Sequence, residues 1–253
     1  MNKKELTDYL VKKAKDPEPY IRTAIPALNK FIDGMYPGTI IGIGAWPGHG
    51  KTTLVMNLMA GLQGQKVSVF DTEMSKYRYM EKFVSLLTET PHEQIRTNLS
   101  GCVDDLISKL SVLDKYNIHI IDLSSPSIQD IETEIKTNLP RVVIIDYFQN
   151  IFISNPMNRY GEYTGIARKL EDLAKKYQCT MVVLSQFKKP ESGVSKPTIF
   201  DFKETGKLAE MFHVALLLGR DGDNMVIDVA KNRDGLIGEF KVQGNWQCNK
   251  LLK

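Results

Sequence analysis

The chain has 253 residues, of which 42% are hydrophobic and 25% charged, so it can form a normal core as one large α/β domain or two small ones. Its formal net charge of +3, from 33 Lys and Arg against 30 Asp and Glu, is too small by itself to indicate nucleic-acid binding. We expect a cytoplasmic protein with no membrane contact, because no apolar run approaches the about 20 residues of a membrane span and the N-terminus lacks a signal-peptide pattern.

The N-terminal residues predict a short helix followed by a break. Residues 4–15 have apolar residues at helical spacing, and "KDPEPY" ends the helix because proline restricts both itself and the residue before it. We therefore expect an arm over residues 1–19 and one domain over 20–253. The start of that domain, up to the "PG" at 37–38, is predicted to be loop-rich.

From residue 39 onward, strands and helices alternate. The strands are continuous apolar runs, which is typical of central parallel strands covered on both faces. After residue 186 strands follow one another, which predicts antiparallel additions to a mostly parallel sheet flanked by helices. The predicted strands are 39–44, 66–71, 117–122, 141–146, 180–186, 213–220, 224–232 and 238–243, and the predicted helices follow residue 50, run from 76 to about 113 in pieces, begin at Ser127, and span about 162–177.

The stretch "GAWPGHGKTT" between the first strand and its helix predicts a phosphate-binding loop. It fits the pattern G-x-x-x-x-G-K-[ST], except that alanine takes the first position. Glycines allow backbone amides to surround a phosphate, the lysine reaches the outer phosphates, and the following threonine can ligate Mg²⁺. The predicted nucleotide-binding residues are Ala45, Trp46, Pro47, Gly48, His49, Gly50, Lys51, Thr52 and Thr53.

Two carboxylates follow neighbouring strands and suit a nucleotide site. Asp146 ends "VVIID", where it can hold the water shell of Mg²⁺; alone, it would be interpreted as capping the next turn. Glu73 in "FDTEMS" can act as a general base toward the attacking water, although alone it would be an acid at a helix N-terminus, and Asp71 is easily confused with it.

Three further residues are weaker candidates. Gln186 ends the strand "VVLSQ", where an amide can sense a γ-phosphate or simply be a polar strand end. Lys231 and Arg233, two residues apart in "AKNRDG", can project the same way and act as arginine-finger elements in a neighbouring subunit. On its own, this run is more typical of a solvated hairpin tip. The three cysteines, Cys102, Cys179 and Cys248, match no zinc pattern and are expected to be packing residues.

The ordered set "FDTEMS", "VVIIDYFQN", "VVLSQFKKP", "KPTIFDFKETG" and "VIDVAKNRDGLIGEF" resembles the RecA-type motor domain of the DnaB family of hexameric replicative helicases. The phosphate loop with its initial alanine is similar to that family too, and the resemblance spans roughly residues 20–245. It implies a RecA-like P-loop NTPase core that couples hydrolysis of ATP with Mg²⁺ to 5′-to-3′ movement on single-stranded DNA through a homo-oligomeric ring. Primase or a helicase loader are the expected partners.

The resemblance also implies roles for individual residues. Lys51 and Thr52 would contact phosphate and Mg²⁺, Asp146 the metal, Glu73 the water and Gln186 the γ-phosphate, with Lys231 and Arg233 as the finger pair. DNA would meet the loops at about 150–160 and 187–206, and the proposed contacts are Lys188, Lys189, Lys203, Glu204 and the backbone of Gly206.

The chain departs from the family pattern at several positions. Only about 20 residues precede the motor, where the family has an N-terminal collar domain, and Lys203 replaces the usual arginine. His213 stands where the family often has an acid, and Trp46 and His49 are bulky for a phosphate loop. A RecA- or RadA-like recombinase and a loader or regulatory ATPase are the alternatives, and the "EMS" segment and the K-x-R pair favour the helicase over them.

Overall fold

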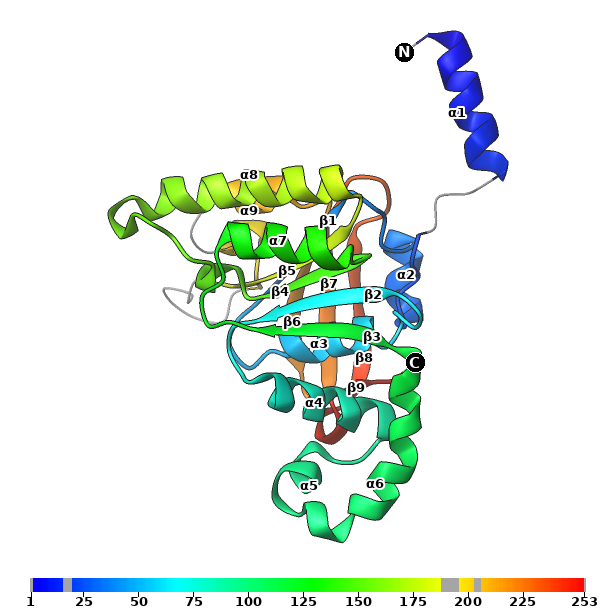
Figure 1. The fold of residues 1–253 in the computed structure, drawn as a ribbon, viewed down its shortest axis with the longest axis vertical. Coiled ribbons are helices and arrows are strands. Elements are labelled where there is room, and N and C mark those ends of the chain that lie inside the picture. Colours follow the sequence, from blue (N-terminus) through cyan, green and yellow to red (C-terminus); the bar gives the residue numbers. More distant parts are fainter. Residues whose placement is uncertain (1, 16–19, 188–195, 203–205, 253) are drawn as a thin grey trace.

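The computed structural model describes residues 2–15, 20–187, 196–202 and 206–252. Within these ranges the strands form a single sheet of nine, covered by helices on both faces (Figure 1). The helices are α1 (Lys3–Lys15), α2 (Pro26–Ile32), α3 (Lys51–Met59), α4 (Lys76–Thr88), α5 (His92–Thr97), α6 (Val103–Lys109), α7 (Ile128–Asn138), α8 (Arg159–Tyr177) and α9 (Gly206–Met211). The strands are β1 (Ile40–Ala45), β2 (Lys66–Asp71), β3 (Asn117–Asp122), β4 (Val142–Asp146), β5 (Thr180–Gln186), β6 (Val214–Asp221), β7 (Asn224–Asn232), β8 (Gly238–Asn245) and β9 (Lys250–Leu251).

The strand order is β3-β2-β4-β5-β1-β6-β7-β8-β9. The first six strands in this order pair in parallel, and β6 through β9 pair antiparallel. The predicted fold class, a mostly parallel sheet with antiparallel strands added near the C-terminus, is therefore confirmed. Because β1 lies between β5 and β6, the turn after β1 emerges in the middle of the sheet, next to the ends of strands that come from distant parts of the chain.

Two apolar cores fill the space between the sheet and its helices. Helices α2, α3 and α4 pack on one face, and α7, α8 and α9 pack on the other. The capping box at Ser127 explains where α7 begins: its hydroxyl accepts from the backbone N–H of Asp130, whose carboxylate accepts from Ser127 in return. Helix α8 begins at Arg159, a little before the predicted start, because the side chain of Asn158 caps it.

Sequence reasoning missed three elements. Residues 26–32, predicted to be loop, form α2, because Pro26 occupies the first turn, where its missing N–H has no helical partner to lose, and Leu28 and Ile32 are buried. Helix α9 lies within the segment predicted to be a polar loop, and β9 adds a two-residue edge to β8. All three cysteines are buried, and none of the helices in the described ranges is long and apolar enough to cross a membrane.

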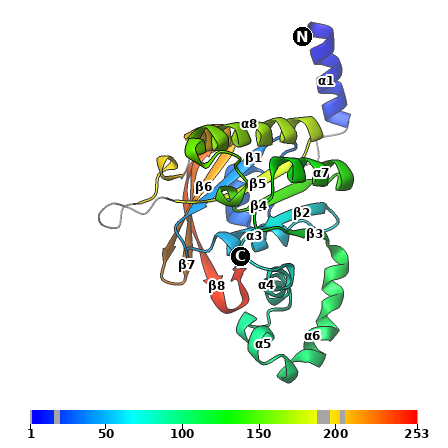
Figure 2. The same ribbon diagram turned by 60° about the vertical axis from the view of Figure 1, so that its left-hand side comes forward.

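The first helix stands apart from the remainder of the fold in both ribbon views (Figures 1 and 2). Leu6, Leu10 and Val11 are exposed on it. An amphipathic helix that keeps its apolar residues in solvent has not found a packing surface within its own chain.

Candidate nucleotide-binding site

The turn between β1 and α3 has the backbone shape of a phosphate loop. Gly48 and Gly50 have φ values of 78° and 85°, in the left-handed region that side chains disfavour. Gly50 is the N-cap of α3, and no side chain caps the helix. The first N–H groups of α3 are therefore not satisfied by a capping side chain, which suits an anion at this end of the helix dipole.

Thr52 and Asp146 come together although 94 positions separate them. The Thr52 hydroxyl donates to Oδ2 of Asp146 at 3.1 Å. Asp146 ends β4 with its side chain buried, and its Oδ1 has no hydrogen-bond partner among the described residues. Burial, followed by the nearby charges of Glu73 and Asp71, raises the pKa of Asp146 to about 7, while Thr52 and Lys51 act against this.

Asp71 and Glu73 have separate places despite their proximity. Asp71 pairs with Asp146 in the register of β2 and β4, and its Oδ1 accepts from the backbone N–H groups of Glu73 (3.0 Å) and Met74 (3.3 Å). Burial raises its pKa to about 6. Glu73 lies beyond the strand end and is exposed. Asp71 thus shapes the turn that presents Glu73, and of the two acids only Glu73 is open to solvent.

This group of acids suits a divalent cation. Asp71 and Asp146 each bury one carboxylate oxygen that has no partner in the described part of the chain, which is costly unless a cation or a proton compensates. Within the same residues, no group of three or more His, Cys, Asp or Glu could hold a metal by itself. A Mg²⁺ ion held by Thr52 and the Asp146 carboxylate would complete its shell with water and phosphate oxygens, as this ion usually does.

The end of β5 lies directly beside the phosphate loop. Gln186 pairs with Ala45 in the parallel register, and the N–H of Phe187 donates to the Ala45 carbonyl at 3.1 Å. The ring of Trp46 packs edge-on against Phe187, with centroids 5.9 Å apart, so it covers the base of the loop. His49 also packs edge-on against Trp46.

Two contacts at this site had no signal in the sequence. Gln149, after β4, donates to the Ser185 hydroxyl at 2.7 Å and accepts from the backbone N–H of Gln186, so it connects the two strand ends. Trp246 lies against Gly50, where an added Cβ would be 3.2 Å from its ring, and Arg220 stacks on that ring at 4.2 Å. Neither contact follows a local spacing, because each joins residues far apart in the chain.

The finger pair lies at the other end of β1. Lys231 pairs with Ala215, and the neighbouring Val214 pairs with Ile41 near the start of β1. Four strand residues, about 13 Å, separate Ile41 from the beginning of the phosphate loop. Both cations project the same way: Lys231 donates to the carbonyls of Ala209 and Glu210, and Arg233 donates to that of Glu210.

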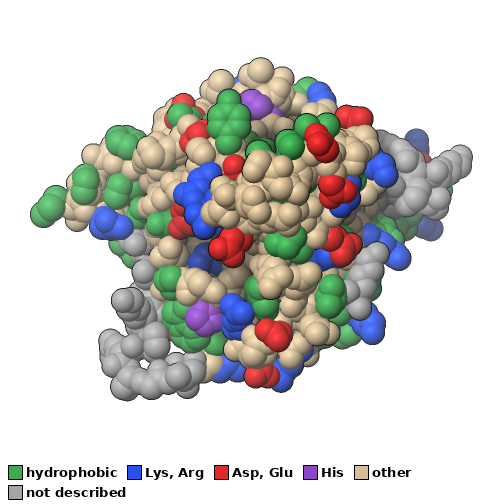
Figure 3. Space-filling view, turned by 90° about the horizontal axis from the view of Figure 1, so that it is seen from below, with side chains coloured by type: hydrophobic (Ala, Val, Ile, Leu, Met, Phe, Trp, Pro, Cys, Tyr) green, Lys and Arg blue, Asp and Glu red, His purple; other side chains and the backbone are tan. Residues whose placement is uncertain are grey.

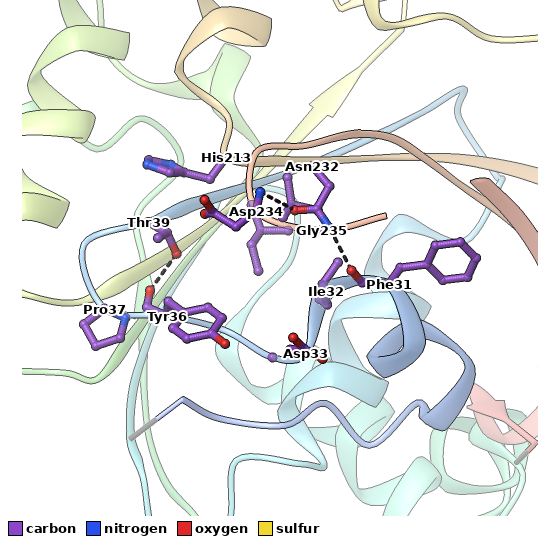
Figure 4. A pocket seen from close by; sticks show the side chains of 13 residues that line it. Phe31, Ile32, Asp33, Tyr36, Pro37, Thr39, His213, Asn232, Asp234 and Gly235 are labelled. Carbon is purple, nitrogen blue, oxygen red and sulfur yellow. Dashed lines mark hydrogen bonds between the residues drawn. The ribbon is translucent and has the colours of Figure 1, made fainter. Parts of the chain in front are cut away.

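Beside the finger pair is a cavity of about 390 Å³ (Figure 4). His213, Asn232 and Asp234 line it together with α2 and the start of β1, and Asn232 spans it to the carbonyl of Phe31. His213 accepts from the backbone N–H of Ile40 through Nδ1, and burial lowers its pKa. This cavity is a strand's length from the phosphate loop and is separate from the nucleotide site.

Four of the predicted DNA contacts, Lys188, Lys189, Lys203 and Glu204, lie outside the described residues. Gly206 is the first residue of α9, with open space where a side chain would be. The segment that follows β4 is described, and Phe152, Met157 and Tyr160 on it are exposed.

Comparisons with known proteins agree on one family. The family model described as "DnaB-like helicase C terminal domain" matches residues 21–252. The chain is 27% identical over 246 residues to the replicative DNA helicase DnaB of Mycoplasma genitalium, covering 85% of this chain and 52% of that protein. It is 29% identical over 258 residues to the same helicase of Buchnera aphidicola, covering 89% and 54%. The chain thus spans about half the length of the curated relatives it matches.

Two solved structures share the fold. One is described as an ATPase domain, with a TM-score of 0.88, 19% identity, and coverage of 99% of this chain and 97% of that one. The other is a DnaB-like replicative helicase described with its interactions with primase, with a TM-score of 0.87, 20% identity, and coverage of 100% and 68%.

Proposed function

Since the chain belongs to the family of DnaB-like helicase C-terminal domains, we propose that it is an ATP-hydrolysing motor that moves 5′-to-3′ along single-stranded DNA and separates duplex strands. The observation that carries the proposal is the contact between Thr52 and Asp146, with Glu73 exposed beside it. This contact brings a phosphate loop, a metal-binding carboxylate and a candidate base to the same edge of the sheet.

Each residue has a defined task in this proposal. The loop amides and Lys51 bind the outer phosphates of ATP, and Thr52 and Asp146 hold Mg²⁺, which neutralises phosphate charge. Glu73 orients the attacking water and accepts its proton, since it is the acid open to solvent. Gln186, beside the start of the loop, senses the terminal phosphate.

We further propose that active sites form between copies of the chain in a hexameric ring. Lys231 and Arg233 lie a strand's length from their own phosphate loop, so they suit the site of a neighbouring copy. The exposed apolar residues of α1 suit packing on a neighbour as well. Single-stranded DNA would pass the segments after β4 and β5 in the cytoplasm, and a primase or a helicase loader is the proposed protein partner.

ATPase activity measured against protein concentration, with and without single-stranded DNA, tests this function. We expect the rate per chain to rise steeply with concentration and to increase with DNA, because each site needs residues from two copies. A rate per chain that is independent of concentration would contradict shared sites. Continuous filaments on DNA in electron micrographs would instead favour a recombinase.

A further inference from the structure

Next to Glu73, on the side away from the sheet, the surface has a second hollow. It has a volume of about 430 Å³ and lies between α4, α5 and the turn Trp246–Cys248 that precedes β9. Glu73 and Met74 form one side of it, and Arg78, Lys82 and Arg96 form another. This hollow is in the half of the molecule that ends in α5 and α6, the end that faces the viewer in Figure 3.

We propose that this hollow, here called the α4–α5 pocket, binds an oxyanion of the phosphate class. The ligand that fits the proposed function is the inorganic phosphate released when ATP is hydrolysed beside Glu73, and in that respect the inference rests on the proposed function. The pocket would hold this product after it leaves the nucleotide and before it reaches solvent.

The three cations of the pocket have no counter-ions. In the part of the chain that the structure describes, neither Arg78 nor Lys82 nor Arg96 has its side chain in a hydrogen bond or within 4.0 Å of a carboxylate. Other lysines on the surface are paired within one helical turn of an acid, as Lys109 is with Asp105. Three like charges around one hollow repel one another, and an anion between them removes that cost.

His92 provides a second, independent observation. Its Nε2 is buried and has no hydrogen-bond partner among the described residues, and the acid beside it, Glu81, is 4.0 Å away. Burial and the charges of Lys82, Arg96 and Arg78 lower its pKa, so the ring is neutral at pH 7 and can donate one hydrogen bond without adding charge. Trp246 and Asn249 close the pocket on the remaining side.

The pocket is also in the right place for a product. In an in-line displacement, phosphate departs from the nucleotide toward the side from which water attacked. Glu73, the proposed base, is on that side and lines the pocket. Guanidinium groups such as those of Arg78 and Arg96 match the oxygens of phosphate in pairs, which gives selectivity over chloride.

Calorimetric titration of inorganic phosphate into the full chain, at constant ionic strength and with ADP and Mg²⁺ saturating, tests the proposal. We expect saturable binding in the unmodified chain. Lys82→Gln and Arg96→Gln should each weaken it by about ten-fold, because each removes a charge-assisted hydrogen bond. Arg96→Lys should recover part of the loss.

Lys115→Gln is the matched control, since this exposed lysine is outside the pocket and should leave phosphate affinity unchanged. Thermal unfolding of every variant shows that the fold is retained. Absence of saturable binding, or equal affinity in the Lys82→Gln Arg96→Gln double variant, would overturn the proposal. So would phosphate binding that disappears once ADP is bound, because the anion would then occupy the phosphate loop. Failure of ADP itself to bind would count against the proposed function, and phosphate titrated alone would still judge the pocket.

Discussion

Replacement of Asp146 by asparagine is expected to make the metal-free protein more stable while removing its activity. The folded chain holds this carboxyl with a pKa of about 7 instead of 3.8, because it is buried near Glu73 and Asp71. Between these two pH values the folded state therefore binds more protons than the unfolded state, and stability falls as pH rises. Each unit of pKa corresponds to about 1.4 kcal/mol, so above pH 7 the ionised group costs about 4 kcal/mol.

Urea unfolding at pH 8 and pH 5, with EDTA and without nucleotide, measures this cost. Asparagine has the same size and can still accept the hydrogen bond from Thr52. We expect Asp146→Asn to raise the free energy of unfolding by up to about 4 kcal/mol at pH 8 and by less than half as much at pH 5. ATPase activity, and any stabilisation by Mg²⁺ with ADP, should be lost.

Asp114→Asn is the control, because this aspartate is exposed and should leave the unfolding midpoint unchanged at both pH values. An Asp146→Asn protein that is equally stable or less stable than the unmodified chain at pH 8 would refute the reasoning. It would mean that the carboxylate is solvated or paired in a way that its burial and its unpartnered Oδ1 contradict.

Three other predictions concern separate parts of the fold. Arg233→Ala should abolish ATPase activity and leave the affinity for a fluorescent ATP analogue within about two-fold, a difference of about 0.4 kcal/mol; a large loss of affinity in the isolated monomer would contradict a role in the neighbour's site. Ser127→Ala should lower the free energy of unfolding by about 1 kcal/mol in urea titrations, because it removes the capping box of α7, and an unchanged midpoint would show that the cap is energetically silent. Gly50→Ala should cost about 1–3 kcal/mol, because its φ is 85° and the new Cβ would lie 2.7 Å from Met225. Gly48→Ala has a similar φ with open space around it, and it should cost less; equal costs would show that contact with Met225 is unimportant.

The sheet could be predicted because its strands are buried on both faces. Runs such as "VVIID" leave no alternation to interpret, and Asp146 and Asp71 at the strand ends then meet at one edge by topology alone. The short helices α2 and α9 could not be predicted in the same way. Each has only one or two turns, and the proline that begins α2 resembles a helix breaker in sequence.

The contacts within the site divide along the same line. The phosphate loop has a local pattern, so its residues can be named from spacing. Gln149 and Trp246 reach the loop and the end of β5 through the folded chain, and no spacing announces them. The α4–α5 pocket is likewise assembled from three separate segments, and its cations in sequence resemble ordinary surface charge.

The hydrogen bonds of Lys231 and Arg233 have a consequence for assembly. In a single chain both cations already hold the last carbonyls of α9, the helix that directly follows the segment at residues 203–205. Reaching a neighbour's nucleotide is then an exchange of partners, and only the difference between the two sets of contacts can favour it. A neighbour with an empty site offers these cations nothing better than their own helix. Nucleotide loading in one copy would therefore uncap α9 in the next, and the order in which sites fill would be passed around the ring as a change at the end of this helix.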